Sequence, residues 1–214
     1  MISLLYTTAR PYLIQPVLDV WRERARDWDQ IEVVLVTDDP LDIDYPRLRY
    51  QHNSGRRDCV TGWNLAASLA QGSTFVQVSD DLFPPPEWDE AIRGFVEGKQ
   101  AVSLLLPDER GSVPAVFHPV LTRGAYEHFG YLYPPDFRSM FCDVWFYHAH
   151  LQAGFLLGMK GDAFWHHRHR STYDLQEDDV TRVHESDERY AEGRKVLRRE
   201  AKKLGILIKF GEGN

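Results

Sequence analysis

The sequence predicts an α/β protein with a mostly parallel central sheet and helices on both of its faces. Two observations lead to this fold class. Short apolar runs rich in β-branched residues alternate with segments of helical periodicity, in the order strand, helix, strand, strand, helix, strand. Polar residues follow most of these strands directly, and open α/β sheets bind ligands at the carboxyl ends of their strands. The first half of the chain is therefore expected to be a Rossmann-like nucleotide-binding unit.

The composition fits one domain with a substantial apolar core. Of the 214 residues 43% are apolar and 13% aromatic, and the formal net charge of −7 does not suggest a general nucleic-acid-binding surface. Cys59 and Cys142 lie far apart and lack metal-ligand spacing, which is typical of a reducing compartment. The sequence contains neither a long apolar run nor an N-terminal signal-peptide pattern. We therefore expect a cytoplasmic protein without a transmembrane segment.

The first half is expected to contain four strands and two helices. These are the strands 2–6, 31–36, 48–51 and 73–78 and the helices 12–26 and 58–70. Asp58 can cap the second helix, and Gly72 lies just beyond its end. Neither GxGxxG nor GxxxxGK[ST] occurs. The charge of a bound phosphate would therefore be neutralised by a metal ion together with Arg10, Arg56 or Arg57.

The second half alternates in the same way but less regularly. Its expected elements are the helices 87–97, 123–129 and 141–153, the strands 101–106, 113–121 and 155–159, and an extended segment at 163–171. Pro114 and Pro119 restrict the 113–121 strand to a sheet edge or to a broken strand. The aromatic, proline-rich loop 131–137 either shapes a binding cleft or packs on the surface. From Asp187 onward we expect an amphipathic helix whose basic face is solvated or attracts an anionic acceptor or membrane.

Two adjacent carboxylates, Asp80 and Asp81, follow the strand expected at 73–78. Three prolines come soon after them, so the strand cannot continue as a ladder. Oxygen ligands at the carboxyl end of a buried strand suit Mg²⁺ or Mn²⁺, and such an ion commonly bridges to phosphates. The other interpretation is a solvated acidic turn.

Two later features could take part in chemistry. Asp143 lies in the first turn of the helix expected at 141–153, where the helix dipole favours its ionised form. An ionised carboxylate there could serve as a general base, or it could only cap the helix. His167 and His169 point to the same side of an extended segment, and imidazole is a common ligand of first-row transition metals. The histidines either complete a metal site with Asp81 or form a solvated strand end.

Taken in order, these features resemble the glycosyltransferases of the GT-A fold, and in particular family 2, the inverting enzymes that use nucleotide sugars. The resemblance covers about residues 2–172 and rests on TTARP, VTDDP, NSGRRDCVTGWNLAASLAQGSTFVQVSDD, CD and the late histidines. It implies a single GT-A-like catalytic domain. The implied divisions are a catalytic domain at 1–186, with a nucleotide-sugar half at about 1–106 and an acceptor half at about 107–172, and a basic helix and tail at 187–214.

The resemblance also implies roles for single residues. The DxD motif of the family falls on Ser79, Asp80 and Asp81, so that Asp80 would contact the ribose and Asp81 would bind the metal ion at the diphosphate. Asp143 would be the general base. The further metal- or diphosphate-contacting residue would be His167 or His169. The residues expected to bind the nucleotide sugar are Thr8, Arg10, Asp38, Asp39, Asn53, Arg57, Asn64 and Asp80.

Two positions depart from the family pattern, since Ser79 and Cys142 stand where the family usually has acidic residues. Sugar-stacking platforms could come from the tryptophans, although core packing is expected for at least two of the candidates. These are Trp88, Trp145 and Trp165.

The expected activity is the metal-dependent transfer of a sugar from a UDP-sugar to an acceptor hydroxyl, with inversion. A divalent cation, Mn²⁺ or Mg²⁺, would stabilise the leaving diphosphate, and Asp143 would deprotonate the acceptor. The choice of uridine rests on Asp38 or Asp39, which the resemblance places against the base. Two alternatives remain, a nucleotidyltransferase with a similar sheet and a noncatalytic nucleotide- or sugar-binding module. The acceptor could be a glycan, a lipid-linked sugar, a protein or a modified nucleobase.

Overall fold

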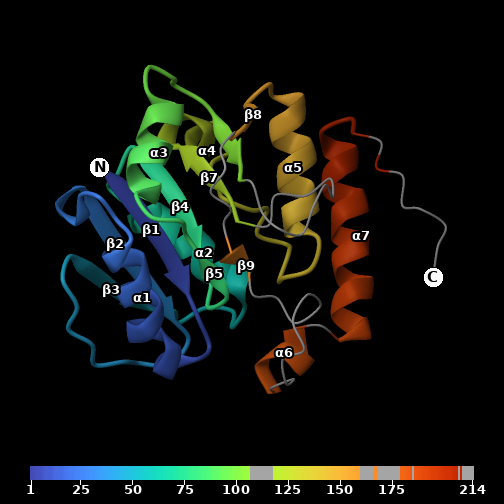
Figure 1. Cartoon of the computed structure of the whole chain (residues 1–214). Coiled ribbons are helices and arrows are strands. Elements are labelled where there is room, and N and C mark those ends of the chain that lie inside the picture. Colours follow the sequence, from blue (N-terminus) through green and yellow to red (C-terminus); the bar gives the residue numbers. More distant parts are fainter. Residues whose placement is uncertain (107–117, 160–165, 168–178, 185, 207, 209–214) are drawn as a thin grey trace.

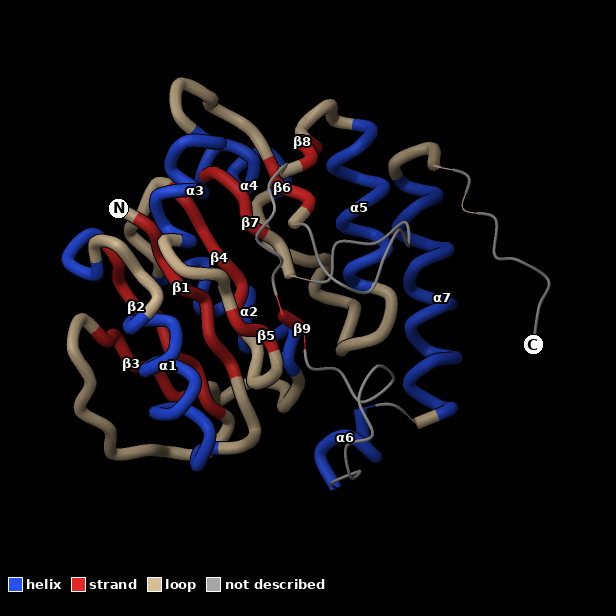
Figure 2. The backbone as a smooth tube through the Cα atoms, viewed as in Figure 1, coloured by secondary structure: helices blue, strands red, loops and turns tan. Residues whose placement is uncertain are grey.

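Within the described residues of this computed structural model, a seven-stranded sheet has the order β3-β2-β1-β4-β7-β6-β8 (Figure 1 and Figure 2). The described residues are 1–106, 118–159, 166–167, 179–184, 186–206 and 208. β1 to β4 run parallel, β7 is antiparallel to both β4 and β6, and β8 is parallel to β6. The predicted mostly parallel sheet is therefore confirmed. The strands are β1 Ile2–Thr7, β2 Ile31–Thr37, β3 Leu48–His52, β4 Thr74–Val78, β6 Ser103–Leu105, β7 Val120–Thr122 and β8 Leu156–Gly158.

Helices cover both faces of this sheet, as predicted (Figure 2). One face packs against α1 Ile14–Glu23, which follows a 3₁₀ turn, and α3 Trp88–Val96. The apolar cluster on the other face includes side chains of four helices. These are α2 Cys59–Leu69, α4 Arg123–Phe129, α5 Cys142–Gln152 and α7 Asp187–Lys203, of which α7 packs against α5.

The side chains of β2 show how one strand serves both layers. Val33 and Leu35 lie in the apolar cluster that contains α1, whereas Val34 and Val36 lie in the cluster that contains α2. Successive side chains of a strand point to opposite faces, so a strand covered on both faces reads as a continuous apolar run. This is why the 31–36 segment could be assigned from sequence.

The position of β7 excludes one of the two alternatives for the 113–121 segment, the edge strand. The strand lies inside the sheet between β4 and β6 and not at an edge. It begins only after Pro119, whose missing N–H would have interrupted the ladder, and the carbonyl of Pro119 accepts a hydrogen bond from Gln77 N at 2.9 Å. The prolines therefore shorten the described strand without moving it to an edge, and residues 113–117 lie outside the described residues.

The helix expected from Asp187 onward is α7, which lies alongside α5 (Figure 1). Gly193 lets α7 approach the segment just before α5 closely, because a Cβ atom there would lie 2.5 Å from the carbonyl oxygen of Met140. The apolar side chains Val196 and Leu197 are buried in the cluster that contains α2 and α5. The division between 186 and 187 stays a prediction. None of the described helices is both long and apolar enough to cross a membrane.

Candidate functional site

The site lies where the chain connections change direction, between β1 and β4. The crossover from β1 to β2 contains α1 on one face, and the crossover from β3 to β4 contains α2 on the other. Tyr6 pairs with Val78 at the carboxyl ends of β1 and β4. A crevice at such a topological switch point is the usual ligand site of an open α/β sheet. The polar residues that follow the two strands are therefore brought to one place.

Asp80 is the centre of this place. Its Oδ1 accepts a hydrogen bond from Tyr6 Oη at 2.7 Å, and its Oδ2 accepts from Thr8 Oγ1 at 2.9 Å and from Arg10 Nη1 at 3.0 Å. Burial raises the pKa of Asp80, while the three donors act in the opposite direction. The predicted convergence of Thr8, Arg10 and Asp80 is thus present, and the carboxylate has a fixed orientation.

Tyr6 belongs to this cluster although the sequence did not single it out. Its ring is fully buried in the sheet, and burial beside Asp80 raises the pKa of its hydroxyl well above the ordinary range. The sequence could have indicated Tyr6, because successive side chains of an extended segment point to opposite sides. Tyr6 and Thr8 are two residues apart and therefore share one side.

Asp81 lies next to Asp80 at the start of a small second sheet. Ser79 Oγ donates to Asp81 Oδ1 at 2.6 Å. The sheet pairs β5 Leu82–Phe83 with β9 His166–His167, and Leu82 is opposite His167. The strand pairing therefore brings the backbone of His167 beside the residue that follows Asp81, whereas His169 lies outside the described residues.

The residue types expected here fit a divalent cation. A carboxylate and an imidazole supply oxygen and nitrogen ligands of the kind that Mn²⁺ accepts, and oxygens of a diphosphate commonly complete such a site. Among the side chains that the structure describes, no group of three or more histidine, cysteine, aspartate or glutamate residues is placed to hold a metal ion. The metal role of Asp81, His167 and His169 therefore stays a prediction.

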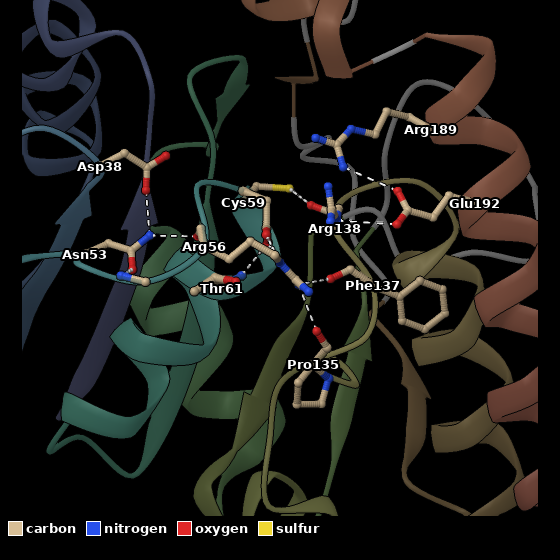
Figure 3. Close-up of polar contacts among 12 residues, drawn as sticks. Asp38, Asn53, Arg56, Cys59, Thr61, Pro135, Phe137, Arg138, Arg189 and Glu192 are labelled. Carbon is tan, nitrogen blue, oxygen red and sulfur yellow. Dashed lines mark hydrogen bonds and ion pairs between the residues drawn. The ribbon is translucent and has the colours of Figure 1, made fainter.

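The end of β2 carries the second acidic pair. Asn53 Nδ2 donates to Asp38 Oδ1 at 2.5 Å and to the carbonyl oxygen of Arg56 at 3.0 Å (Figure 3). Asn53 itself is buried. Asp39 instead forms an ion pair with Arg57 at 2.7 Å, and both of these side chains are exposed. Asp38 is thus the more rigidly held of the two acids.

Asn64 binds the segment 131–141, which we call the 131–141 loop. Its Oδ1 accepts from the backbone N–H groups of Leu132 and Tyr133, both at 3.0 Å, and its Nδ2 donates to the carbonyl oxygen of Tyr133 at 2.8 Å. None of these described contacts involves the residues around Asp80. The expected contact between Asn64 and a nucleotide sugar stays a prediction.

Arg56 binds the same loop further along (Figure 3). Its guanidinium pairs with Asp58 and donates to the carbonyl oxygens of Pro135 at 2.8 Å and Phe137 at 2.5 Å. Arg56 is thus bound to this loop and Arg57 to Asp39, whereas Arg10 lies beside Asp80 at the ends of β1 and β4 and is the remaining candidate phosphate neutraliser. Of the two interpretations of the 131–137 segment, the structure favours packing, because Leu132, Tyr133, Pro134 and Phe137 are buried.

Asp143 lies in the first turn of α5, as predicted. The residue before the helix, Phe141, has a left-handed backbone with φ of 68°, so the chain turns sharply into α5. Burial raises the pKa of the Cys142 thiol, and the neighbouring charge of Asp143 raises it further. Cys142 stands where the family usually has an acidic residue, and it is buried in the apolar cluster that contains α2. The residue before the candidate general base is therefore a core side chain.

The structure removes two of the candidate stacking platforms. Trp88 is 0% and Trp145 1% exposed, and both side chains belong to the core. Trp165 lies outside the described residues. Stacking on Trp88 or Trp145 would need the core to open, so the core packing that was expected for at least two of the candidates is confirmed for these two.

The fold has well-defined counterparts among solved structures, although no protein-family model and no curated protein matches the sequence. S. aureus TarS 1–349 in complex with UDP-GlcNAc superposes with a TM-score of 0.72, at 16% identity, over 97% of this chain and 68% of that chain. The mannosyltransferase PcManGT from Pyrobaculum calidifontis, in complex with GDP-Man and Mn²⁺, gives a TM-score of 0.62 at 14% identity over 96% and 76%.

A third similar structure is a β1,4-galactosyltransferase 7 variant from Drosophila in complex with manganese, UDP-Gal and xylobiose. It matches with a TM-score of 0.54 at 9% identity over 86% of this chain and 78% of that chain. The fold of the present chain is the GT-A fold of glycosyltransferases, and this prediction is confirmed.

Proposed function

We propose that the chain is a metal-dependent glycosyltransferase that moves a sugar from a UDP-sugar to an acceptor hydroxyl with inversion. The observation that supports this most is the convergence of Thr8, Arg10 and Asp80 at the switch point of a GT-A fold, with Asp81 as the next residue. Similar structures of this fold contain UDP-GlcNAc, GDP-Man or UDP-Gal. The site therefore has the place and the residue types for a nucleotide diphosphate.

The proposed binding site for the nucleotide sugar has an oriented carboxylate and a cation side by side. Asp80 accepts three hydrogen bonds from protein side chains and is the candidate to contact the ribose hydroxyls, and Arg10 adds a positive charge at the same strand ends. Asp81 with His167 or His169 would hold Mn²⁺ or Mg²⁺. When bound, such an ion supplies charge neutralisation for the leaving diphosphate.

The residue proposed to contact the nucleobase is Asp38. Asn53 binds its Oδ1 at 2.5 Å, and the second oxygen can then accept the N3–H of a uracil ring. Cytosine has an unprotonated acceptor at N3, which a carboxylate repels. This difference supports uridine over cytidine.

The proposed general base is Asp143, which would take the proton of the acceptor hydroxyl as that oxygen attacks the anomeric carbon. Its place in the first turn of α5 stabilises the ionised form through the helix dipole. Attack from the face opposite the diphosphate inverts the anomeric centre. The carbon–oxygen bond to the diphosphate breaks as the bond to the acceptor oxygen forms.

The test is a release assay with a panel of nucleotide sugars in the presence of Mn²⁺. Release of UDP from a UDP-sugar, or its transfer product, supports the proposal. Release of pyrophosphate from a nucleoside triphosphate would instead identify a nucleotidyltransferase. Tight binding without either product would identify a noncatalytic binding module.

A further inference from the structure

The 131–141 loop leads directly into α5 and therefore determines where Asp143 lies. All of its residues are described, and they contain neither helix nor strand. The backbone groups of such a segment need hydrogen-bond partners from elsewhere. One anchor is the ring of Tyr133, whose Oη donates to Gln77 Oε1 on β4 at 2.5 Å. The remaining anchors come mainly from Arg56, which precedes α2, and from Asn64 in the middle of α2.

Asn64 satisfies three backbone groups of this loop with one side chain. Its carbonyl oxygen accepts from two N–H groups, and its amide nitrogen donates to one carbonyl, so the orientation of the amide is defined by its partners. Asparagine is not a favoured residue inside a helix. Its presence in the middle of α2 is explained by these three bonds to Leu132 and Tyr133.

Arg56 holds the next part of the loop. Its partner Asp58 is nearly inaccessible, with 1% of the side chain exposed, and also caps α2 by accepting from Thr61 N at 2.8 Å. The backbone carbonyl of Arg56 accepts from Asn53, which also binds Asp38. A continuous series of contacts thus joins the end of β2 to the 131–141 loop (Figure 3).

On its opposite side the loop packs against α7, where Gly193 lies close to the carbonyl of Met140 and the rings of Phe141 and Tyr190 are 5.9 Å apart, and two ion pairs add to this packing. Arg138 contacts Glu192 at 3.4 Å and Asp136 contacts Arg199 at 2.6 Å, and in both pairs the side chains are 41–59% exposed. Exposed ion pairs of this kind contribute little to stability. The hydrogen bonds from Asn64 and Arg56 to the backbone of the loop come from the α2 side, and they fix the path of that backbone.

We infer that Asn64 and Arg56 are positioning residues that place the proposed general base. They hold the 131–141 loop so that the first turn of α5 presents Asp143 to the acceptor. This inference rests on the proposed function. In this inference Asn64 acts through Asp143, and not through the direct contact with the nucleotide sugar that the sequence suggested.

The experiment is a double-mutant comparison of sugar transfer. Asn64→Ala should lower kcat about 100-fold, since a displacement of about 1 Å at a reacting group has an effect of this size. Its affinity for UDP with Mn²⁺, measured by calorimetry, should stay that of the wild type. In the Asp143→Asn background, Asn64→Ala should have no further effect, because the group that it positions has already lost its function. A radiolabelled donor and long incubation keep the slow variants measurable.

The matched control is Ser68→Ala, one turn further along α2. Ser68 is exposed, and its hydroxyl donates within the helix to Leu65 O. This variant should transfer sugar at the wild-type rate. If Asn64→Ala does not fold, Asn64→Asp takes its place, since it keeps the acceptor for two N–H groups and loses only the donor to Tyr133.

Three results would overturn the inference in distinguishable ways. An equal loss of transfer in both backgrounds would show that Asn64 does not act through Asp143. A loss of UDP affinity with unchanged kcat would show that Asn64 contacts the nucleotide sugar directly. A wild-type protein that transfers no sugar from any donor, although it is folded and binds Mn²⁺, would refute the proposed function itself and with it this inference.

Discussion

Replacing Asp38 with asparagine is expected to move the base preference from uracil towards cytosine. Asn53 Nδ2 donates to Asp38 Oδ1 at 2.5 Å, so in Asp38→Asn the amide oxygen stays at this position and the amide nitrogen takes the place of Oδ2. That nitrogen cannot accept the N3–H of uracil, but it can donate to N3 of cytosine. Since a hydrogen bond to a charged group contributes about 1.5–3 kcal/mol, the UDP affinity should fall about 10- to 150-fold while the CDP affinity rises.

Calorimetry with UDP, CDP and GDP in the presence of Mn²⁺ measures this change. The matched comparison is Asp39→Asn, because Asp39 is 71% exposed and pairs with Arg57, which is 63% exposed. A wild-type protein that binds GDP as tightly as UDP would refute the uridine assignment. An unchanged ratio of UDP to CDP affinity in Asp38→Asn would refute its contact with the base. A change in Asp39→Asn instead would move the contact to Asp39.

Three further predictions concern the metal, the base and the pH dependence of stability. Asp81→Ala should remove the effect of Mn²⁺ on UDP binding in calorimetry, while the circular dichroism spectrum stays unchanged. If Mn²⁺ still strengthens UDP binding in both His167→Ala and His169→Ala, the histidines do not belong to the metal site. Asp143→Asn should lower kcat about 100- to 10,000-fold with little change in donor affinity, and normal transfer per folded molecule would leave Asp143 as a helix cap. Burial lowers the pKa of His150 from 6.5 to about 3, so its neutral form stabilises the fold fully above pH 6.5 and this stabilisation is lost as the pH falls towards 3. Urea unfolding should show a loss of about 2 kcal/mol between pH 6.5 and about 5 that is absent in His150→Gln, and equal losses in both proteins would contradict the assignment.

Local patterns in the sequence were sufficient for most of the fold. The β-branched runs at 2–6, 31–36 and 73–78 became β1, β2 and β4, because a strand buried on both faces needs apolar side chains throughout. Asp58 caps α2 as predicted, since the cap involves only the neighbouring Thr61. The polar ends of β1 and β4 meet because parallel strands align their carboxyl ends.

Tertiary structure decided the contacts between residues far apart in the chain. The 2.7 Å bond from Tyr6 to Asp80 joins two strands, and the place of β7 between β4 and β6 depends on which strands pair. The amide of Asn64 could bind either a nucleotide sugar or a backbone, and only the path of the 131–141 loop shows the partners at Leu132 and Tyr133.

The sequence by itself therefore determined the fold class, the order of its elements and the end of the sheet at which acids and cations gather. These features follow from apolar periodicity, capping and strand direction, which act over a few residues. The tertiary structure decided which polar side chain binds which partner, as when Arg56 binds the carbonyls of Pro135 and Phe137. Hydrogen bonds act over about 3 Å, and the residues that they join are set by the packing of the whole chain.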